Sequence, residues 1–353
     1  MGILKKTLPL ALIIPLAGCY EDFDPHIDST PVLCLNALIT SGKPVDVSVS
    51  RTWLYTDTAS ERNHSVDDAI VTLYANGMPA GDGFIPREGD HIRIAADSPA
   101  YGHAEAEVDV PLSIPVEITE LDVEPEYLGE YYYYEYPDGY DPSENGYYPF
   151  PDEEDIPDNW EIVRYHKYKV NMKAKVRIHD QAGIENFYIF GCREWNPCGK
   201  QPFRFSNGEL FYEMEPIFGE HLTLTDDLEG NYTSNTTFFS DRQFADKDYT
   251  LNIRIERMTV EISTEFTPEE LMTSGLEMAV YPISKSLYSW YLYSWYDYNG
   301  LQGWMSEIGF ADPISGYSNV STGAGVVGAQ TVSHVIIPGA SFIKPSINIS
   351  STR

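Results

Sequence analysis

The chain has 353 residues and a formal net charge of −31, with 23 Lys and Arg against 54 Asp and Glu, and 13% of its residues are aromatic. Nucleic-acid binding needs a basic face that neutralises phosphates, and this composition leaves too few cations to build one. We therefore expect a protein with ample apolar residues for a core, enough length for two domains, and no nucleic acid among its partners.

The first two dozen residues have the pattern of a bacterial lipoprotein signal. Lys5 and Lys6 precede a short apolar run that ends at Leu16 and is followed by Ala-Gly and Cys19. The run is too short to cross a bilayer core of roughly 30 Å as a helix, as is usual for export signals. The pattern predicts a signal peptide over residues 1–18 and an acylated Cys19 whose lipid chains anchor the protein in a membrane.

Residues 19–30 are predicted to form a lipidated tether. Its beginning, YEDFD at 20–24, is acidic and resembles the export tag that sends some Gram-negative lipoproteins to the cell surface. The alternative is a solvated acidic tether in a chain that is acidic throughout. We favour the tag and expect a lipid-anchored outer-membrane protein that faces the cell exterior.

Residues 31–115 are expected to form a β-sandwich of immunoglobulin size. Polar and apolar residues alternate in VDVSVSR at 45–51 and AEAEVDV at 104–110, which is typical of half-buried strands. Asn76 and Gly77, together with glycines near residues 81–83 and 89, supply turns between these strands.

Residues 124–161 form an acidic, tyrosine-rich insert. It lacks Lys and Arg, contains four consecutive tyrosines at 131–134, and includes several prolines that disfavour a helix or a central strand. The composition predicts a long loop. Because Tyr offers a large amphipathic contact area, Tyr131, Tyr133 and Trp160 are candidate partner or ligand contacts, although a merely mobile loop explains the composition equally well. DGYD at 138–141 lacks the ligand spacing of an EF-hand calcium loop.

The remainder of residues 116–353 is predicted to be a second β-rich domain. Strong alternation marks a strand at 170–178, and further strands are expected at 185–191, 249–255, 259–262 and 334–337. Thr267, Pro268 and Glu270 have the spacing of a capped helix start, and residues 285–298 suit a helix packed on the sheet. The fold class is thus all-β with one or two short helices.

Two of the four cysteines are spaced for a disulfide across a tight loop. Cys192 and Cys198 bracket five residues that include Trp195, and an export signal implies an oxidising compartment. A metal site is the alternative, but the spacing differs from Cys-x-x-Cys and no second pair follows. We favour the disulfide, expect no metal, interpret Cys34 as an ordinary buried strand residue, and add Trp195 to the candidate contacts.

Several segments resemble the domain-of-unknown-function 4249 family of outer-membrane lipoproteins. They are PVL at 31–33, NALIT at 36–40, VSVSRT at 47–52, DAIVTL at 68–73, GDHIRI at 89–94, FSD at 239–241 and YTL at 249–251. The closing segments YSNV at 317–320 and GAGVVGA at 323–329 are the most specific part of the similarity. The resemblance implies an accessory partner of a TonB-dependent outer-membrane transporter, and the acidic insert departs from the family pattern.

Sequence motifs of enzymes are scarce. No His-Glu-x-x-His, Gly-x-Ser-x-Gly or phosphate-loop pattern is present, and the glycines at 323–328 are interpreted as a turn between strands. We expect no catalytic residue and no cofactor, although a glycosidase pair of carboxylates stays open because the sequence does not give their separation. The preferred function is a non-enzymatic accessory or substrate-capture lipoprotein of a transporter, and the alternative is a free-standing module that binds glycan or protein.

Overall fold

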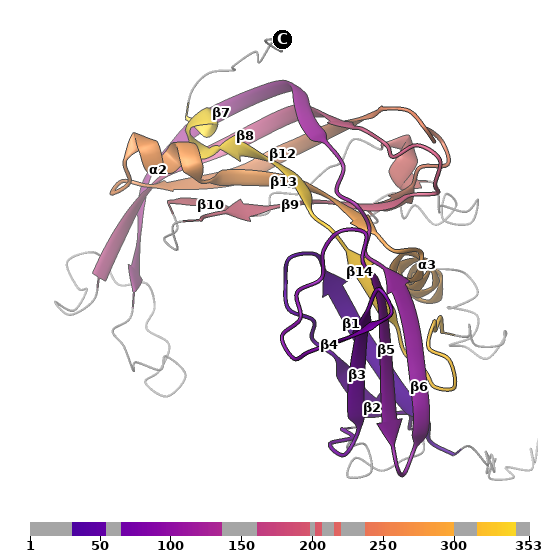
Figure 1. Ribbon diagram of the computed structural model, residues 1–353. Coiled ribbons are helices and arrows are strands. Elements are labelled where there is room, and N and C mark those ends of the chain that lie inside the picture. Colours follow the sequence, from indigo (N-terminus) through magenta and orange to yellow (C-terminus); the bar gives the residue numbers. More distant parts are fainter. Residues whose placement is uncertain are drawn as a thin grey trace, which may run out of the picture. The chain divides into compact units, whose positions relative to one another are not determined.

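The computed structural model describes residues 30–53, 65–135, 161–197, 202–206, 215–219, 237–299 and 316–343. The predicted signal peptide, Cys19, Trp160 and Cys198 lie outside these ranges, and so does most of the acidic insert. Strands dominate the described residues and are arranged in three sheets, which confirms the all-β prediction (Figure 1).

The strands in chain order are β1 (Leu33–Thr40), β2 (Ser48–Arg51), β3 (Ile70–Ala75), β4 (Met78–Ala80), β5 (His91–Ser98), β6 (Gly102–Asp109), β7 (Val116–Glu135), β8 (Glu161–Ile178), β9 (Phe187–Trp195), β10 (Phe203–Ser206), β11 (Phe238–Ser240), β12 (Tyr249–Ser263), β13 (Gly275–Ile283), β14 (Val327–Gln330) and β15 (Ser333–Pro338). The helices are α2 (Pro268–Thr273) and α3 (Lys285–Asn299), with short 3-10 turns at η2 (Pro216–Gly219) and η3 (Gly339–Phe342).

The first sandwich packs the sheet β4-β3-β5-β6 against β1, β2 and β14. Its inward side chains come from alternate strand positions, as the sequence pattern predicts. Asn76 and Gly77 both have positive φ, 51° and 80°, which suits the tight turn that joins β3 to β4. The apolar core consists of Leu33, Leu35, Ile39, Val66, Ile92, Ile94, Ala96, Ala104, Ala106, Val108, Val110, Val320, Val327 and Ala329.

Three of those core residues come from the C-terminal part of the chain. Strand β14 lies parallel to β1, with Ala37 opposite Val327 and Thr40 opposite Gln330. β14 also meets β13, so a single sheet runs in the order β11-β9-β13-β14-β1-β2. The predicted boundary at residue 115 therefore does not separate two independent sheets.

The glycine-rich segment at 323–328 was expected to be a turn, and this expectation is wrong from Ala324 onward. Its backbone runs beside β1, where Leu35 N–H donates to Ala324 O at 2.8 Å. Gly325 has a φ of +111°, and a Cβ at this position would collide with the carbonyl oxygen of Leu35. The glycine is needed because two backbones approach closely here.

The third sheet, in the order β10-β12-β8-β7, contains the longest strands (Figure 1). β7 pairs with β8 from Val116 to Glu135, with register shifts near residues 119 and 128. The expectation of a loop from residue 124 is therefore wrong for residues 124–135, whose tyrosines are part of a paired strand. The predicted strands at 249–255 and 259–262 are one strand, β12, interrupted by a bulge at which Arg257 has a φ of 55°.

A large apolar core lies between this sheet and the sheet that contains β9 and β13. The third sheet contributes alternate residues of β8 and β12 to this core. The other sheet contributes Tyr188, Phe190, Leu276, Met278 and Val280. Several buried aromatic rings stack or tilt against one another in it, including Phe190 on Phe218 at a centroid distance of 6.0 Å. The packing fixes which face of the third sheet points inward and which points outward.

Both predicted helices are present. The Thr267 hydroxyl accepts from Glu270 N–H at 3.2 Å and the Glu270 carboxylate accepts from Thr267 N–H at 2.9 Å, which is the capping box expected for α2. Leu287 and Tyr291 of α3 contact a small apolar cluster with Phe187 and Phe238. No helix among the described residues is both long and apolar enough to cross a membrane.

We expect Gly325→Ala to lower the free energy of unfolding by about 2–4 kcal/mol, because a Cβ strains the backbone and pushes β14 from β1. Gly81→Ala is the matched control, since its φ is ordinary and no atom lies within 4 Å of the added Cβ. Urea unfolding of both variants measures the effect. Equal stabilities would show that the contact with Leu35 is dispensable.

Candidate binding surface

The outward face of the third sheet presents a cluster that we call the tyrosine surface. It is built on alternation: Val170, Met172 and Ala174 of β8 point into the core, and residues of the opposite parity point outward. Strand pairing then brings side chains from four strands together. The tyrosine surface consists of Tyr131 and Tyr133 of β7, Tyr165 and Lys167 of β8, Glu261 of β12 and Arg204 of β10.

A carboxylate holds the tyrosine surface together. Glu261 is almost completely buried, accepts a hydrogen bond from the Tyr133 hydroxyl at 2.7 Å, and lies 3.3 Å from the Lys167 ammonium group. Burial of the phenol, and then its hydrogen bond to Glu261, raise the pKa of Tyr133 to about 12. The hydroxyl is thus a fixed donor at physiological pH.

Cations lie over the rings of the tyrosine surface. The Lys167 ammonium group is 4.9 Å from the ring centroid of Tyr131, and the Arg204 guanidinium is 5.1 Å from that of Tyr165. Tyr165 in turn meets Tyr133 edge to face at 5.5 Å. These contacts restrict the rotamers of the two exposed rings, so that little side-chain entropy remains to be lost when a ligand binds.

The two predicted contact residues on β7 are accessible. Tyr131 is 44% exposed and Tyr133 is 36% exposed, although each is packed on one side. Exposed rings beside a buried carboxylate and two cations suit the binding of a sugar face or a polypeptide, because the rings supply apolar area and the charged groups supply hydrogen bonds. The structure therefore brings Tyr131 and Tyr133 into one cluster.

Trp195 lies elsewhere, on β9, a strand of another sheet. Its ring is 5.2 Å from that of His334 on β15, and His334 in turn contacts Glu277 of β13. Glu277 is completely buried although it points away from the main core, and it contacts Arg193 and His334 Nδ1, the latter at 2.8 Å. Trp195 is therefore half-buried beside an ion-pair cluster and is separate from the tyrosine surface.

Cys192 lies in strand β9, is partly buried and forms no disulfide within the described residues. Burial, with a smaller contribution from Glu277, raises the pKa of this thiol to about 12, so it is poorly suited to reaction as a thiolate. Its predicted partner Cys198 lies outside the described residues, and the disulfide stays a prediction. Cys34 is a strand residue as expected, half-buried, and burial raises its pKa too.

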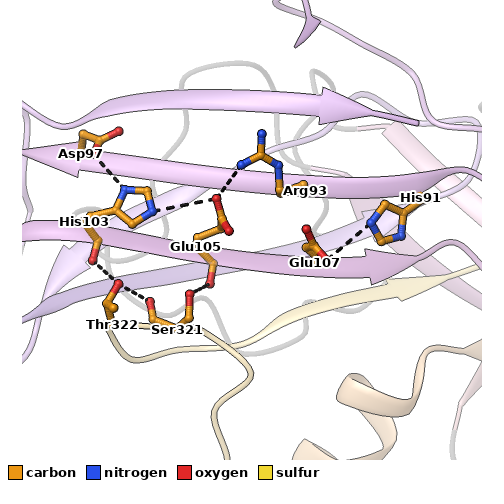
Figure 2. A network of polar contacts seen from close by, with 8 residues as sticks. All are labelled: His91, Arg93, Asp97, His103, Glu105, Glu107, Ser321 and Thr322. Carbon is orange, nitrogen blue, oxygen red and sulfur yellow. Dashed lines mark hydrogen bonds and ion pairs between the residues drawn. The ribbon is translucent and has the colours of Figure 1, made fainter. Parts of the chain in front are cut away.

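A second polar cluster lies on the β5–β6 hairpin of the first sandwich (Figure 2). His91 and His103 each face an aspartate, Asp109 at 2.7 Å and Asp97 at 2.8 Å. Between these pairs, Arg93 Nη1 lies 2.6 Å from a Glu105 carboxylate oxygen. Within the described residues, no group of three or more His, Cys, Asp or Glu side chains is placed to hold a metal ion.

Strand β6 is also clamped at one point by the C-terminal segment (Figure 2). Ser321 and Glu105 exchange both backbone hydrogen bonds, at 2.7 and 3.3 Å, and the Thr322 hydroxyl donates to His103 O at 2.7 Å. The clamp covers the edge of β6 around Glu105.

Sequence reasoning missed the charged members of the tyrosine surface. Lys167 precedes the recognised strand at 170–178 and has the same parity as the basic residues of that strand, so its outward direction was predictable. Glu261 and Arg204 come from strands whose pairing with β8 and β12 is long-range, and no local signal indicated them. Glu277 and His334 also meet only through long-range strand pairing, and no local signal indicated them.

This is an all-β protein with three sheets and two main apolar cores. Its tyrosine surface contains exposed aromatic rings. The chain belongs to the family described as Domain of unknown function (DUF4249), which matches residues 20–335. No curated protein and no solved structure matches the chain significantly.

We expect Arg193→Met to lower the free energy of unfolding by roughly 2–4 kcal/mol, because it removes one partner of the buried Glu277 carboxylate. Lys175→Met breaks the exposed pair with Glu120 and should cost less than about 1 kcal/mol. In a double-mutant cycle, adding Glu277→Gln should recover part of the loss. Strictly additive losses would mean that the two side chains are not coupled.

Proposed function

We propose that the protein is a non-enzymatic lipoprotein, anchored in the outer membrane, that acts as an accessory or substrate-capture partner of a TonB-dependent transporter. The observation that carries this proposal is the tyrosine surface, where exposed rings are held by cations and a buried carboxylate. Membership of the family at 20–335 supports it through the resemblance described above.

The tyrosine surface favours binding over catalysis. Its ionisable groups are engaged with one another: the Glu261 carboxylate accepts from the Tyr133 hydroxyl and pairs with Lys167. A general acid or base needs a group free to exchange a proton with substrate, whereas these groups orient rings. Such pre-ordered aromatic side chains are typical of contact residues in protein interfaces.

The predicted lipid anchor at Cys19 supplies the second part of the argument. A tether in the membrane confines the protein beside a membrane-embedded partner, and this confinement raises the effective concentration. Weak contacts of the tyrosine surface would then suffice for a lasting complex. Electrostatic repulsion from an anionic lipid surface reaches only about 8 Å in physiological salt, so the tether at 19–30 would set most of the distance from the membrane.

A free-standing module that binds glycan or protein is the second candidate. It is favoured by the accessibility of Tyr131, whose ring is packed by Lys167 on one side and is 44% exposed. Aromatic rings of this kind stack on the apolar faces of sugars. This candidate predicts affinity for a ligand when no transporter is present.

Affinity purification of a C-terminally tagged copy from native membranes in mild detergent separates the two candidates. The accessory role predicts that a TonB-dependent transporter is recovered in near-stoichiometric amounts, as identified by mass spectrometry. Recovery of the tagged protein alone would contradict the accessory role and favour the free-standing module, to be followed by glycan-array binding.

We expect Tyr131→Ala to reduce recovery of the transporter by about tenfold, because truncation of one central aromatic contact typically costs more than 1 kcal/mol. Tyr127→Ala is the matched control: Tyr127 is an exposed tyrosine of β7 that contacts His166 and Tyr168 and is not part of the tyrosine surface. Quantitative mass spectrometry of the purified complexes measures both. Equal losses in the two variants would exclude a specific role of the tyrosine surface.

We expect Cys19→Ala to move the protein from the membrane fraction to the soluble fraction, because the acylated side chain is the predicted anchor. Fractionation and detergent phase separation measure the distribution. Cys34→Ala is the control, since Cys34 lies in β1 and has no part in anchoring. Unchanged membrane retention of the Cys19 variant would refute the lipid anchor.

A further inference from the structure

A cleft of about 740 Å³ lies beside the edge of β6. One wall is the continuous run from Glu107 to Leu112, and the other contains residues that precede and begin β9 and residues at the β13–α3 junction. Its lining is mainly apolar, and Leu112 and Ile184 are large apolar side chains in it that remain exposed. The volume falls in the range of ligand-binding pockets in proteins.

The backbone of β6 in this wall is an open strand edge. In an antiparallel pair, the N–H and C=O groups of successive residues point alternately toward the partner strand and away from it. Glu105 bonds to Ser321 with both groups and therefore points away from β5, whereas Val110 N–H, at the opposite parity, donates to Asp90 O at 2.9 Å.

Glu107 and Asp109 share the parity of Glu105, so their backbone groups also point away from β5. The clamp by the C-terminal segment ends at residue 105 (Figure 2). Within the described part of the chain, no backbone group pairs with Glu107 or Asp109 on this side. Among the described residues, two adjacent sets of donor and acceptor groups on this edge thus have no backbone partner.

The charge next to this edge is negative. The carboxylates of Glu107 and Asp109 contact His91, at 3.6 and 2.7 Å, and no Lys or Arg of the described chain forms an ion pair with them. Glu185, on the opposite wall, is already neutralised by Lys285 and Arg242, each at 3.2 Å. The open edge thus combines backbone pairing groups with two carboxylates that lack a strong cationic partner.

We propose that this cleft binds an extended polypeptide segment of a partner protein, which adds to the edge of β6 as a further strand. Charge complementarity calls for Lys or Arg at the alternate positions that face Glu107 and Asp109. Apolar side chains at the intervening positions match the apolar lining of the cleft. Backbone hydrogen bonds would give affinity and the alternating side chains would give selectivity.

Charges on an edge strand have another known use, which is to prevent unwanted pairing between sheets. The two roles predict opposite results with a cationic strand. A purely protective edge repels acidic strands and forms no ordered pair with a basic one. A binding edge instead orders a basic, alternating strand at residues 107 and 109.

The test uses the full chain in mild detergent and a labelled peptide of alternating lysine and valine. Fluorescence anisotropy measures its dissociation constant, and hydrogen exchange measures the amides of Glu107 and Asp109. We expect binding, at least about tenfold slower exchange of both amides, and about tenfold weaker binding of the same peptide with a fully N-methylated backbone. A glutamate–valine peptide should not bind.

Variants separate edge pairing from general attraction to an acidic protein. The double variant Glu107→Gln with Asp109→Asn, and separately Glu107→Pro, should each weaken binding about tenfold, because they remove charge or an edge donor. Asp97→Asn is the matched control, since Asp97 forms the equivalent pair with His103 at the other end of the hairpin. Equal binding of the N-methylated peptide, equal loss in the control, absence of binding, or unchanged exchange would each overturn the proposal.

Discussion

The close contact of the C-terminal glycine-rich segment with β1 is the constraint on which the rest of the structure depends. β14 lies parallel to β1 on one side and meets β13 on the other, and this position makes one sheet of strands from both halves of the chain. The Asn319 side chain fixes the segment through two hydrogen bonds of 2.9 Å with the backbone of Val327. Without this contact the first sandwich would lack part of its core, and the edge of β6 would lose its clamp.

The outward surfaces follow from the same organisation. Alternate side chains of β8 and β12 fill the core between the third sheet and the sheet of β9 and β13. The intervening side chains of these two strands must therefore lie on the outward face. Residues that are unremarkable in the sequence, such as Lys167 and Glu261, become neighbours of the tyrosines through strand register alone. The tyrosine surface therefore exists only because these strands pair. The positions of its side chains depend on the rigidity of the four paired strands.

Much of the fold was predictable from local patterns. Alternation identified the β6 and β8 strands, and the spacing of Thr267 and Glu270 identified the start of α2. These signals are local, since burial on one face and capping involve residues a few positions apart. The tyrosines at 131–133 were misassigned to a loop because prolines and acidic residues dominate the rest of that segment, whereas pairing with β8 extends the strand through them.

Long-range features were not predictable in this way. The glycines at 323–328 have the composition of a turn, and nothing nearby in the sequence reveals that β1 is the backbone they approach. The ion-pair cluster around Glu277 likewise needs three strands in register before its residues meet. Of the candidate contacts, Tyr131 and Tyr133 were identifiable from composition, and their charged neighbours were not.

The pairing of the two chain halves also has a consequence for the order of folding. Val326 N–H donates to the Asn36 side chain at 3.0 Å across a separation of 290 residues. As the chain is made from its N-terminus, β1 therefore exists long before the segment that completes its sheet. Contacts of such long range slow folding, because the entropy of loop closure must be overcome first. The first sandwich should accordingly be among the last parts of the molecule to become stable, and β1 should need protection from other strands until then.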